Sequence, residues 1–312
     1  MKKILSALSA LCVLTAAAGF AACGKSGGNG GNGGNGAENG ITPETAHCVT
    51  QPRRPGYGAV VCDHCGVTLY TGEAEYELSE NHRYYIFKLD GVEYSAEGKV
   101  ILPAFYKGRG EGYLPVLEAR FSDRNVTSLE LSPNVEYVAI NSAVEDVSVS
   151  GNSAFYESAD GVLFDKQMSS LYYYSSAKTA EKYEVPAGTK ELEPRSFREN
   201  KYLKEAVLPG SVEFVGGFTN CSALETVVLP DGVREIYSDA FSGCTGIESV
   251  VIPASVETIG YGAFEGWKSS QTIYVAAEEK PAGWDEGWNN YSEAAVVCLL
   301  YTSPSPRDRS LS

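Results

Sequence analysis

Two stretches of the 312-residue chain decide its fold: residues 224–244 read LETVVLPDGVREIYSDAFSGC, and residues 247–267 read IESVVIPASVETIGYGAFEGW. Both stretches carry apolar residues at the first, fourth and sixth positions, then a proline, and later an Ala-Phe pair. Working outward, prolines recur at intervals of 23, 21 and 23 residues, at Pro186, Pro209, Pro230 and Pro253. This short fixed period predicts a solenoid in which one strand per turn stacks on the next.

Counting one strand per unit predicts a mainly β solenoid of about eight rungs. The rungs are expected at residues 101–103, 129–131, 147–149, 183–185, 206–208, 227–229, 250–252 and 272–275. Because side chains alternate along a strand, the middle residue of each rung should face outward. The outward column is then Glu130, Ser148, Glu184, Val207, Val228, Val251 and Tyr274. We take Glu184, Val207, Val228, Val251 and Tyr274 as the candidate binding face, although β-branched residues also simply suit a strand.

The remaining apolar positions of the repeat are expected to form the core. They are Leu208, Leu224, Leu229, Ile236, Phe241, Ile252, Ile259 and Phe264, together with Cys221 and Cys244. The two cysteines recur where a small buried group is needed, one above the other, so we expect inert core thiols. A disulfide between them would need an orientation that the spacing does not set.

In residue detail these units resemble the BspA-like leucine-rich repeat, a bacterial surface module with Val-x-x-Ile and Ala-Phe-x-x-Cys segments. The resemblance covers roughly residues 84–297. It implies that residues 152–175, with ADGVLFDK at 159–166 and LYYY at 171–174, form an inserted β-hairpin. Alternation would place Tyr172 and Tyr174 on one face of this hairpin and Tyr173 on the other. The resemblance also implies adhesion to matrix or to other cells.

The N-terminus has the layout of a secretory signal: Lys2 and Lys3 precede an apolar run over residues 4–20. The tetrapeptide FAAC at residues 20–23 resembles a bacterial lipobox, so residues 1–22 are expected to be a lipoprotein signal and Cys23 the lipidated residue. A plain cleaved signal is the alternative. Residues 23–45 are rich in Gly and Asn and should act as a flexible tether. The protein is therefore expected to be exported and anchored on the outer face of the cytoplasmic membrane.

Residues 46–80 are expected to form a small Cys-rich ribbon module in front of a repeat domain at 81–297. Cys62 and Cys65 form a Cys-x-x-Cys pair that, with Cys48 and either His47 or His64, could complete a structural zinc site. A disulfide from Cys48 to Cys62 or Cys65 is the competing interpretation for an exported protein. Redox catalysis is disfavoured, because no βαβ pattern surrounds the pair.

The C-terminal residues of the chain resemble a sequence from outside the protein. Residues 298–308, CLLYTSPSPRD, match the conceptual translation of a transposon-end sequencing adapter. We therefore expect residues 298–312 to be non-native, and no site is assigned there.

Composition narrows the function further. A net charge of −15 argues against nucleic acid as a partner, because phosphate contacts need a basic face. All three His residues precede residue 83, and motifs for nucleophilic, zinc-protease or phosphate-loop chemistry are missing, so no enzyme is predicted. The expected function is a non-catalytic, lipid-anchored surface protein whose solenoid binds other macromolecules, in adhesion or in interaction with host or cell-surface proteins, with a protein or glycan ligand of unknown identity. A cell-wall or carbohydrate-binding protein is the alternative, and an accessory domain of an exported enzyme system is a third possibility; the oligomeric state stays open.

Overall fold

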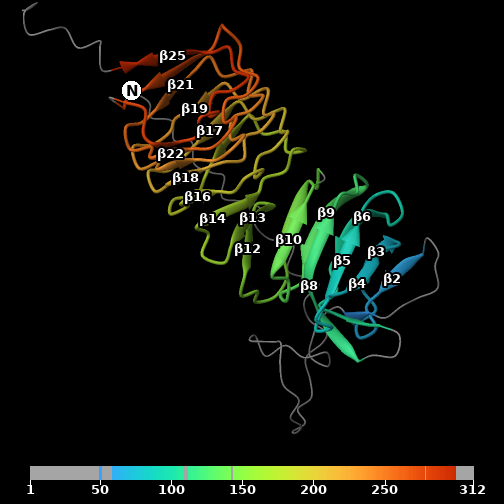
Figure 1. Cartoon of the computed structure of the whole chain (residues 1–312). Helices are drawn as coiled ribbons and strands as arrows, with labels where there is room; N and C mark the ends of the chain where they lie inside the picture. The colour runs from blue at the N-terminus through green and yellow to red at the C-terminus, as the bar shows by residue number, and fades with distance from the viewer. Residues whose placement is uncertain (1–48, 51–57, 109–111, 142, 278, 300–312) are drawn as a thin grey trace, which may run out of the picture.

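The computed structural model describes residues 49–50, 58–108, 112–141, 143–277 and 279–299. The chain is mainly β, and its strands stack into an elongated array that runs from the blue and cyan end to the orange end (Figure 1). Within those ranges, no helix is long and apolar enough to cross a membrane. The predicted signal, Cys23, the tether, His47, Cys48 and residues 300–312 lie outside the described residues.

The C-terminal half builds one side of the array from two short parallel sheets. Their strands are β15 (Lys182–Glu184), β17 (Glu205–Val207) and β19 (Thr226–Val227), and then β21 (Ser249–Ile252), β23 (Thr272–Val275) and β25 (Ala295–Cys298). The first five lie at predicted rungs. β25 was not predicted, because its sequence AVVC lacks the proline that marks the other units. It pairs in parallel with β23, with Val275 opposite Cys298, so the array extends one strand beyond the expected last rung.

A second parallel sheet forms the other side of the repeat region. Its parallel strands are β14 (Ser170–Tyr173), β16 (Glu191–Leu192), β18 (Phe214–Val215), β20 (Glu235–Ile236), β22 (Thr258–Ile259) and β24 (Gly283–Trp284). The antiparallel strands β12 (Tyr156–Ala159) and β13 (Val162–Asp165) continue the same sheet beyond β14. Each unit therefore contributes two strands, whereas the sequence analysis counted one. Most of these strands are two residues long with a single inward side chain, which is too short to produce the period-2 pattern of a strand.

The core between these sheets contains a ladder of phenylalanines, one from each unit. The ring centroids of Phe197 and Phe218 are 4.8 Å apart, those of Phe218 and Phe241 are 5.5 Å apart, and those of Phe241 and Phe264 are 5.6 Å apart. All four rings are fully buried. Aromatic rings carry large apolar areas, so this ladder is a main source of stability in the repeat region.

The N-terminal half contains two further sheets. One comprises β1 (Val49–Thr50), β7 (Phe105–Lys107), β8 (Tyr113–Phe121), β5 (Tyr85–Leu89) and β4 (Glu75–Leu78), with β10 (Tyr137–Ile140) paired to β8. The other has the order β11 (Asp146–Val149), β9 (Val126–Leu131), β6 (Ala96–Ile101), β3 (Thr68–Gly72) and β2 (Ala59–Val61). Strands β6, β9 and β11 lie at or beside the first three predicted rungs.

The Cys-rich segment contributes strands to both of these sheets and does not form a module of its own. Its hairpin β2–β3 pairs with β6, with Thr71 opposite Glu97, and Cys62 and Leu69 share one apolar cluster with Val100. The expected boundary between residues 80 and 81 therefore does not divide the fold. A two-stranded hairpin is at best marginally stable alone, and here it gains stability by packing on the first rungs of the array.

The inserted hairpin joins the two halves. Strands β12 (Tyr156–Ala159) and β13 (Val162–Asp165) are antiparallel, and β13 then pairs with β14. Because side chains alternate along β13, Leu163 enters the N-terminal core while Val162 and Phe164 enter the C-terminal core. Strand β13 is thus buried on both faces. Tyr174 departs from the predicted alternation: it is buried in the C-terminal core, because β14 ends at Tyr173.

Candidate functional site

The candidate binding face lies on the outer surface of strands β15 to β23. Glu184 and Val207 are exposed and stand opposite each other in the pair β15–β17. Val228 is 71 % exposed and Val251 is 48 % exposed, while Tyr274, opposite Val251, is half-buried. Exposed Val297 in β25 stands opposite Tyr274 and continues the column, which the sequence analysis did not foresee.

A groove of about 720 Å³ opens on this face beside Val228 and Val251. It lies between two separate sheets, because β19 is the last strand of one sheet and β21 belongs to the next. Exposed Glu225 and Glu248 also line the groove and give its rim a negative charge. The sequence contains a signal for this rim, since each glutamate directly follows the first apolar residue of its unit.

The predicted repeat core lies beneath this face. Leu224, Leu229, Ile236, Phe241, Ile252, Ile259, Phe264, Cys221 and Cys244 are all buried in one cluster. Leu208 is only partly buried against that cluster, because β17 ends at Val207 and the chain turns away toward Pro209. The core residues hold the outward side chains in place and are not available to a ligand.

The two core thiols are held by hydrogen bonds to the preceding unit. The Cys221 Sγ donates to the Phe197 carbonyl at 3.0 Å, and the Cys244 Sγ donates to the Phe218 carbonyl at 2.9 Å. The indole Nε1 of Trp267 donates to the Phe241 carbonyl in the corresponding place of the next unit. Burial raises the pKa of the Cys221 thiol to about 12 and that of Cys244 well above its ordinary value. This environment suppresses thiolate chemistry.

Cys62 lies in the tight turn between β2 and β3, in a different environment. The Val49 N–H donates to its Sγ at 3.4 Å, and the Gly66 N–H donates to its carbonyl at 2.9 Å. Burial alone would raise the pKa of the Cys62 thiol, but hydrogen bonds from backbone N–H groups of Cys65, His64 and Val49, and from the Cys65 side chain, bring it below its ordinary value. Such donors stabilise a thiolate, which is the form that binds metal.

The structure brings together only part of the predicted metal or disulfide set. Cys62 is buried, Cys65 is half-buried and His64 is exposed, while Cys48 lies outside the described residues. Across the described ranges, no group of three or more His, Cys, Asp or Glu is arranged to hold a metal ion. The zinc and disulfide alternatives therefore both stay predictions.

Comparisons with known proteins bear on the repeat region. Residues 166–280 match six copies of the BspA type leucine rich repeat region. No curated protein matches the chain. Among solved structures, a leucine-rich repeat protein from Eubacterium ventriosum ATCC 27560 is similar over 73 % of this chain and 82 % of its own, with 16 % identity and a TM-score of 0.50.

Two further structures are more distant in shape. The pneumococcal vaccine antigen PcpA is similar over 64 % of this chain and 67 % of its own, with 20 % identity and a TM-score of 0.40. A leucine rich cell surface protein from Faecalibacterium prausnitzii A2-165 is similar over 72 % of this chain and 97 % of its own, with 13 % identity and a TM-score of 0.36. The Eubacterium ventriosum structure supports the leucine-rich repeat fold, and residues 166–280 of this chain are similar to the BspA type leucine rich repeat region.

Proposed function

We propose that this protein is a non-catalytic, lipid-anchored binding protein of the bacterial cell surface, and that its outward repeat face contacts a protein partner. The observation that carries the proposal is the groove of about 720 Å³ beside Val228 and Val251. Val228 is 71 % exposed and lies just beyond β19, so strand preference does not account for an apolar residue there. Exposed apolar surface beside a groove is typical of an interaction site.

The charges around the groove indicate what kind of surface would fit it. Glu225 and Glu248 flank the two valines, and the chain as a whole carries a net charge of −15. A partner with an apolar patch and a basic rim would complement both features, and its approach would be accelerated by electrostatic attraction. A protein surface supplies this combination more readily than a neutral glycan.

A three-residue variant of the outward face tests the proposal. Val207, Val228 and Val251 are replaced together by Ser, and binding of the full chain to a panel of matrix proteins, peptidoglycan and glycans is compared with the native chain. We expect the native chain to bind one or more matrix proteins, and the variant to keep its fold but lose at least tenfold in affinity. Val92→Ser is the matched control, because Val92 is 92 % exposed in the turn after β5.

Two results would contradict the proposal. Undiminished binding by the triple variant would show that the valines do not contact the partner and are present only because β-branched residues suit a strand. Binding confined to glycans or peptidoglycan would transfer the function to the carbohydrate class. The hairpin offers that class little support, because Tyr173 and Tyr174 are buried and Tyr172 is the single exposed ring of the three.

The membrane anchor is tested separately. Cells expressing the chain are fed a labelled fatty acid, and label is expected on the native chain but not on Cys23→Ser. Globomycin, which blocks lipoprotein signal cleavage, should cause the uncleaved form to accumulate. Label that persists on Cys23→Ser would exclude this residue as the anchor.

Metal and mass analysis distinguish the two interpretations of the Cys-rich segment. A zinc site at Cys48, Cys62 and Cys65 predicts about one zinc ion per chain produced under reducing conditions, lost in Cys62→Ser. A disulfide predicts no bound zinc and a mass lower by two hydrogen atoms when the chain is produced without reductant.

A further inference from the structure

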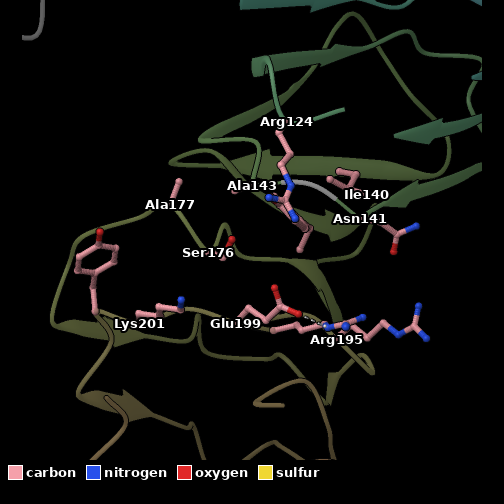
Figure 2. A pocket seen from close by; sticks show the side chains of 12 residues that line it. Arg124, Ile140, Asn141, Ala143, Ser176, Ala177, Arg195, Glu199 and Lys201 are labelled. Carbon is pink, nitrogen blue, oxygen red and sulfur yellow. Dashed lines mark hydrogen bonds and ion pairs between the residues drawn. The ribbon is translucent and has the colours of Figure 1, made fainter. Parts of the chain in front are cut away.

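A basic cleft of about 860 Å³ lies where the N-terminal sheets meet the repeat region. Arg124 reaches it from the loop between β8 and β9, and Arg195, Arg198 and Lys201 reach it from the turn between β16 and β17. Figure 2 shows Arg124 on one side and Arg195, Glu199 and Lys201 on the other. Four cations against one carboxylate give the cleft a local positive charge, although the whole chain carries −15.

Most of this positive charge is not neutralised by the protein. Arg198 pairs with Glu199, with Nε and Oε1 3.1 Å apart. Arg124, Arg195 and Lys201 form no ion pair with any residue in the described ranges. Elsewhere on the repeat surface, Lys204 pairs with Glu181 and Arg234 with Glu257. In a chain so rich in carboxylates, three unpaired cations around one cavity indicate a site for an external anion.

The backbone of the cleft turn supplies a second, independent observation. Arg195 has φ = 78° and Glu199 has φ = 62°, both in the left-handed region that long side chains avoid. The corresponding left-handed positions around the ladder phenylalanines of later units carry short residues or glycine: Gly217, Asn220, Asp239, Gly243, Gly262 and Gly266. This unit alone places long charged side chains at such positions. Strained backbone of this kind clusters at functional sites, where the side chain it presents is needed.

We propose that this cleft binds an anionic oligosaccharide, whose carboxylate or sulfate groups are held by Arg124 on one side and by Arg195 on the other. A guanidinium group matches the two oxygens of a carboxylate or sulfate with two parallel N–H donors. Because the cleft is open to water, which weakens each ion pair, several charged donors are needed together. The volume falls within the range of small-ligand sites. This site differs from the outward valine face and from the function proposed for it.

The lining of the cleft favours a sugar over an acidic peptide. The aliphatic side chains in it come from Ile140, Ala143 and Ala177, two of which are single methyl groups, so the cleft offers no deep pocket of large aliphatic residues to a peptide. Tyr202 also lines the cleft and is 49 % exposed, and an aromatic ring presents an apolar face to the C–H groups of a sugar. Asn141 adds an amide that can both donate and accept hydrogen bonds with hydroxyl groups.

The test is calorimetric titration of the full chain, solubilised in detergent, with four probes. A heparin-derived hexasaccharide carries sulfate and carboxylate, an oligogalacturonate carries carboxylate alone, maltohexaose is neutral, and a hexaglutamate peptide is acidic without a sugar. We expect one or both anionic sugars to bind, with affinity falling as salt rises, and the neutral sugar and the peptide not to bind.

Variants then locate the binding. Arg124→Ala and Arg195→Asn should each weaken anionic-sugar binding at least tenfold; Asn is chosen because it tolerates the left-handed backbone at position 195. Arg195→Lys should retain part of the affinity, because it keeps the charge and loses the fork. Arg83→Ala, an exposed arginine in the turn between β4 and β5, is the matched control.

The outcomes separate this proposal from the outward-face proposal. The triple Val→Ser variant should bind the anionic sugar as the native chain does. The proposal is overturned if neither anionic sugar binds, if hexaglutamate binds as well as the sugars, or if Arg83→Ala weakens binding as much as Arg124→Ala. Unfolding curves of each variant show whether a loss of binding comes from misfolding. If Arg195→Asn misfolds, the reduced affinity of Arg195→Lys still tests the role of the guanidinium group.

Discussion

The rings of Phe218 and Phe241 stack with their centroids 5.5 Å apart and their planes inclined by 9°. Each of these residues comes from a different unit of the repeat, so the contact is one between neighbouring turns of the solenoid. Stability in such arrays is approximately a sum of unit terms and nearest-neighbour terms. A ring in the middle of the ladder therefore contributes to two interfaces at once.

Replacing Phe218 by Ala should consequently destabilise the protein strongly. The ring is fully buried between Phe197 and Phe241, and loss of such a ring costs about 3 to 5 kcal/mol. Urea unfolding followed by circular dichroism measures the change. Phe155→Ala is the control, because the Phe155 ring is exposed, and it should cost under about 1 kcal/mol. Equal losses for the two variants would contradict a ladder-based core.

Two adjacent valines offer a second test of the strand geometry. Val250 is 2 % exposed and Val251 is 48 % exposed, because they point to opposite faces of β21. Val250→Ser should cost about 2 to 3 kcal/mol, since it removes buried methyl groups and buries a hydroxyl. Val251→Ser should change the unfolding free energy by no more than about 0.5 kcal/mol. If guanidinium unfolding showed the reverse order, the assignment of inward and outward faces would be wrong.

The cysteines should differ in reactivity according to their surroundings. With a pKa of about 12, Cys221 is only about one part in ten thousand thiolate at pH 8, and it is fully buried. Iodoacetamide should therefore leave Cys221 and Cys244 unmodified in the folded chain, while exposed Cys298 is alkylated. Mass spectrometry of tryptic peptides measures this, and urea should abolish the difference. Rapid alkylation of Cys221 under native conditions would contradict its assignment to the core.

Glu193 should make stability depend on pH. Burial, then the Glu191 and Asp165 carboxylates, raise the pKa of the Glu193 carboxyl above its ordinary value. The folded chain thus holds this proton more tightly than the unfolded chain does. Ionisation of Glu193 then destabilises the fold as pH rises from the ordinary glutamate pKa through the raised one.

Glu193→Gln removes that cost. We expect its melting temperature to exceed that of the native chain by up to about 2 °C at pH 7, since the carboxyl is only half-buried. The difference should vanish near pH 3, where Glu193 is protonated in both states. Glu97→Gln, at an exposed position of β6, serves as the control. A melting temperature that falls at pH 7 in Glu193→Gln would show that the charge is stabilised by contacts other than these.

The sequence predicted the rungs well where a unit carries the whole motif. At 250–252 an apolar pair brackets an exposed valine and is followed by Pro253, and β21 lies there. The sequence did not predict features that depend on only one or two residues in each unit. The two-residue strands of the repeat region, such as β20 and β22, have one inward side chain each, here Ile236 and Ile259, and this recurrence is visible only when units are compared.

The sites show the same contrast. The outward valines could be placed from alternation alone, because each lies within one rung or next to it. The basic cleft could not, because Arg124 and Arg195 are 71 positions apart in the chain and meet only through the packing of the two halves. Its one local signal is that Arg195 and Glu199 occupy places that later units fill with short residues or glycine.

The burial of strand β13 in two cores affects how the protein unfolds. Leu163 belongs to one core, and Val162 and Phe164 belong to the other, within three consecutive residues. Melting either half would leave one face of β13 bare to solvent and remove part of the support of the other half. Because the hairpin packs on both halves and couples their unfolding, we expect calorimetry to register a single cooperative transition across the whole array.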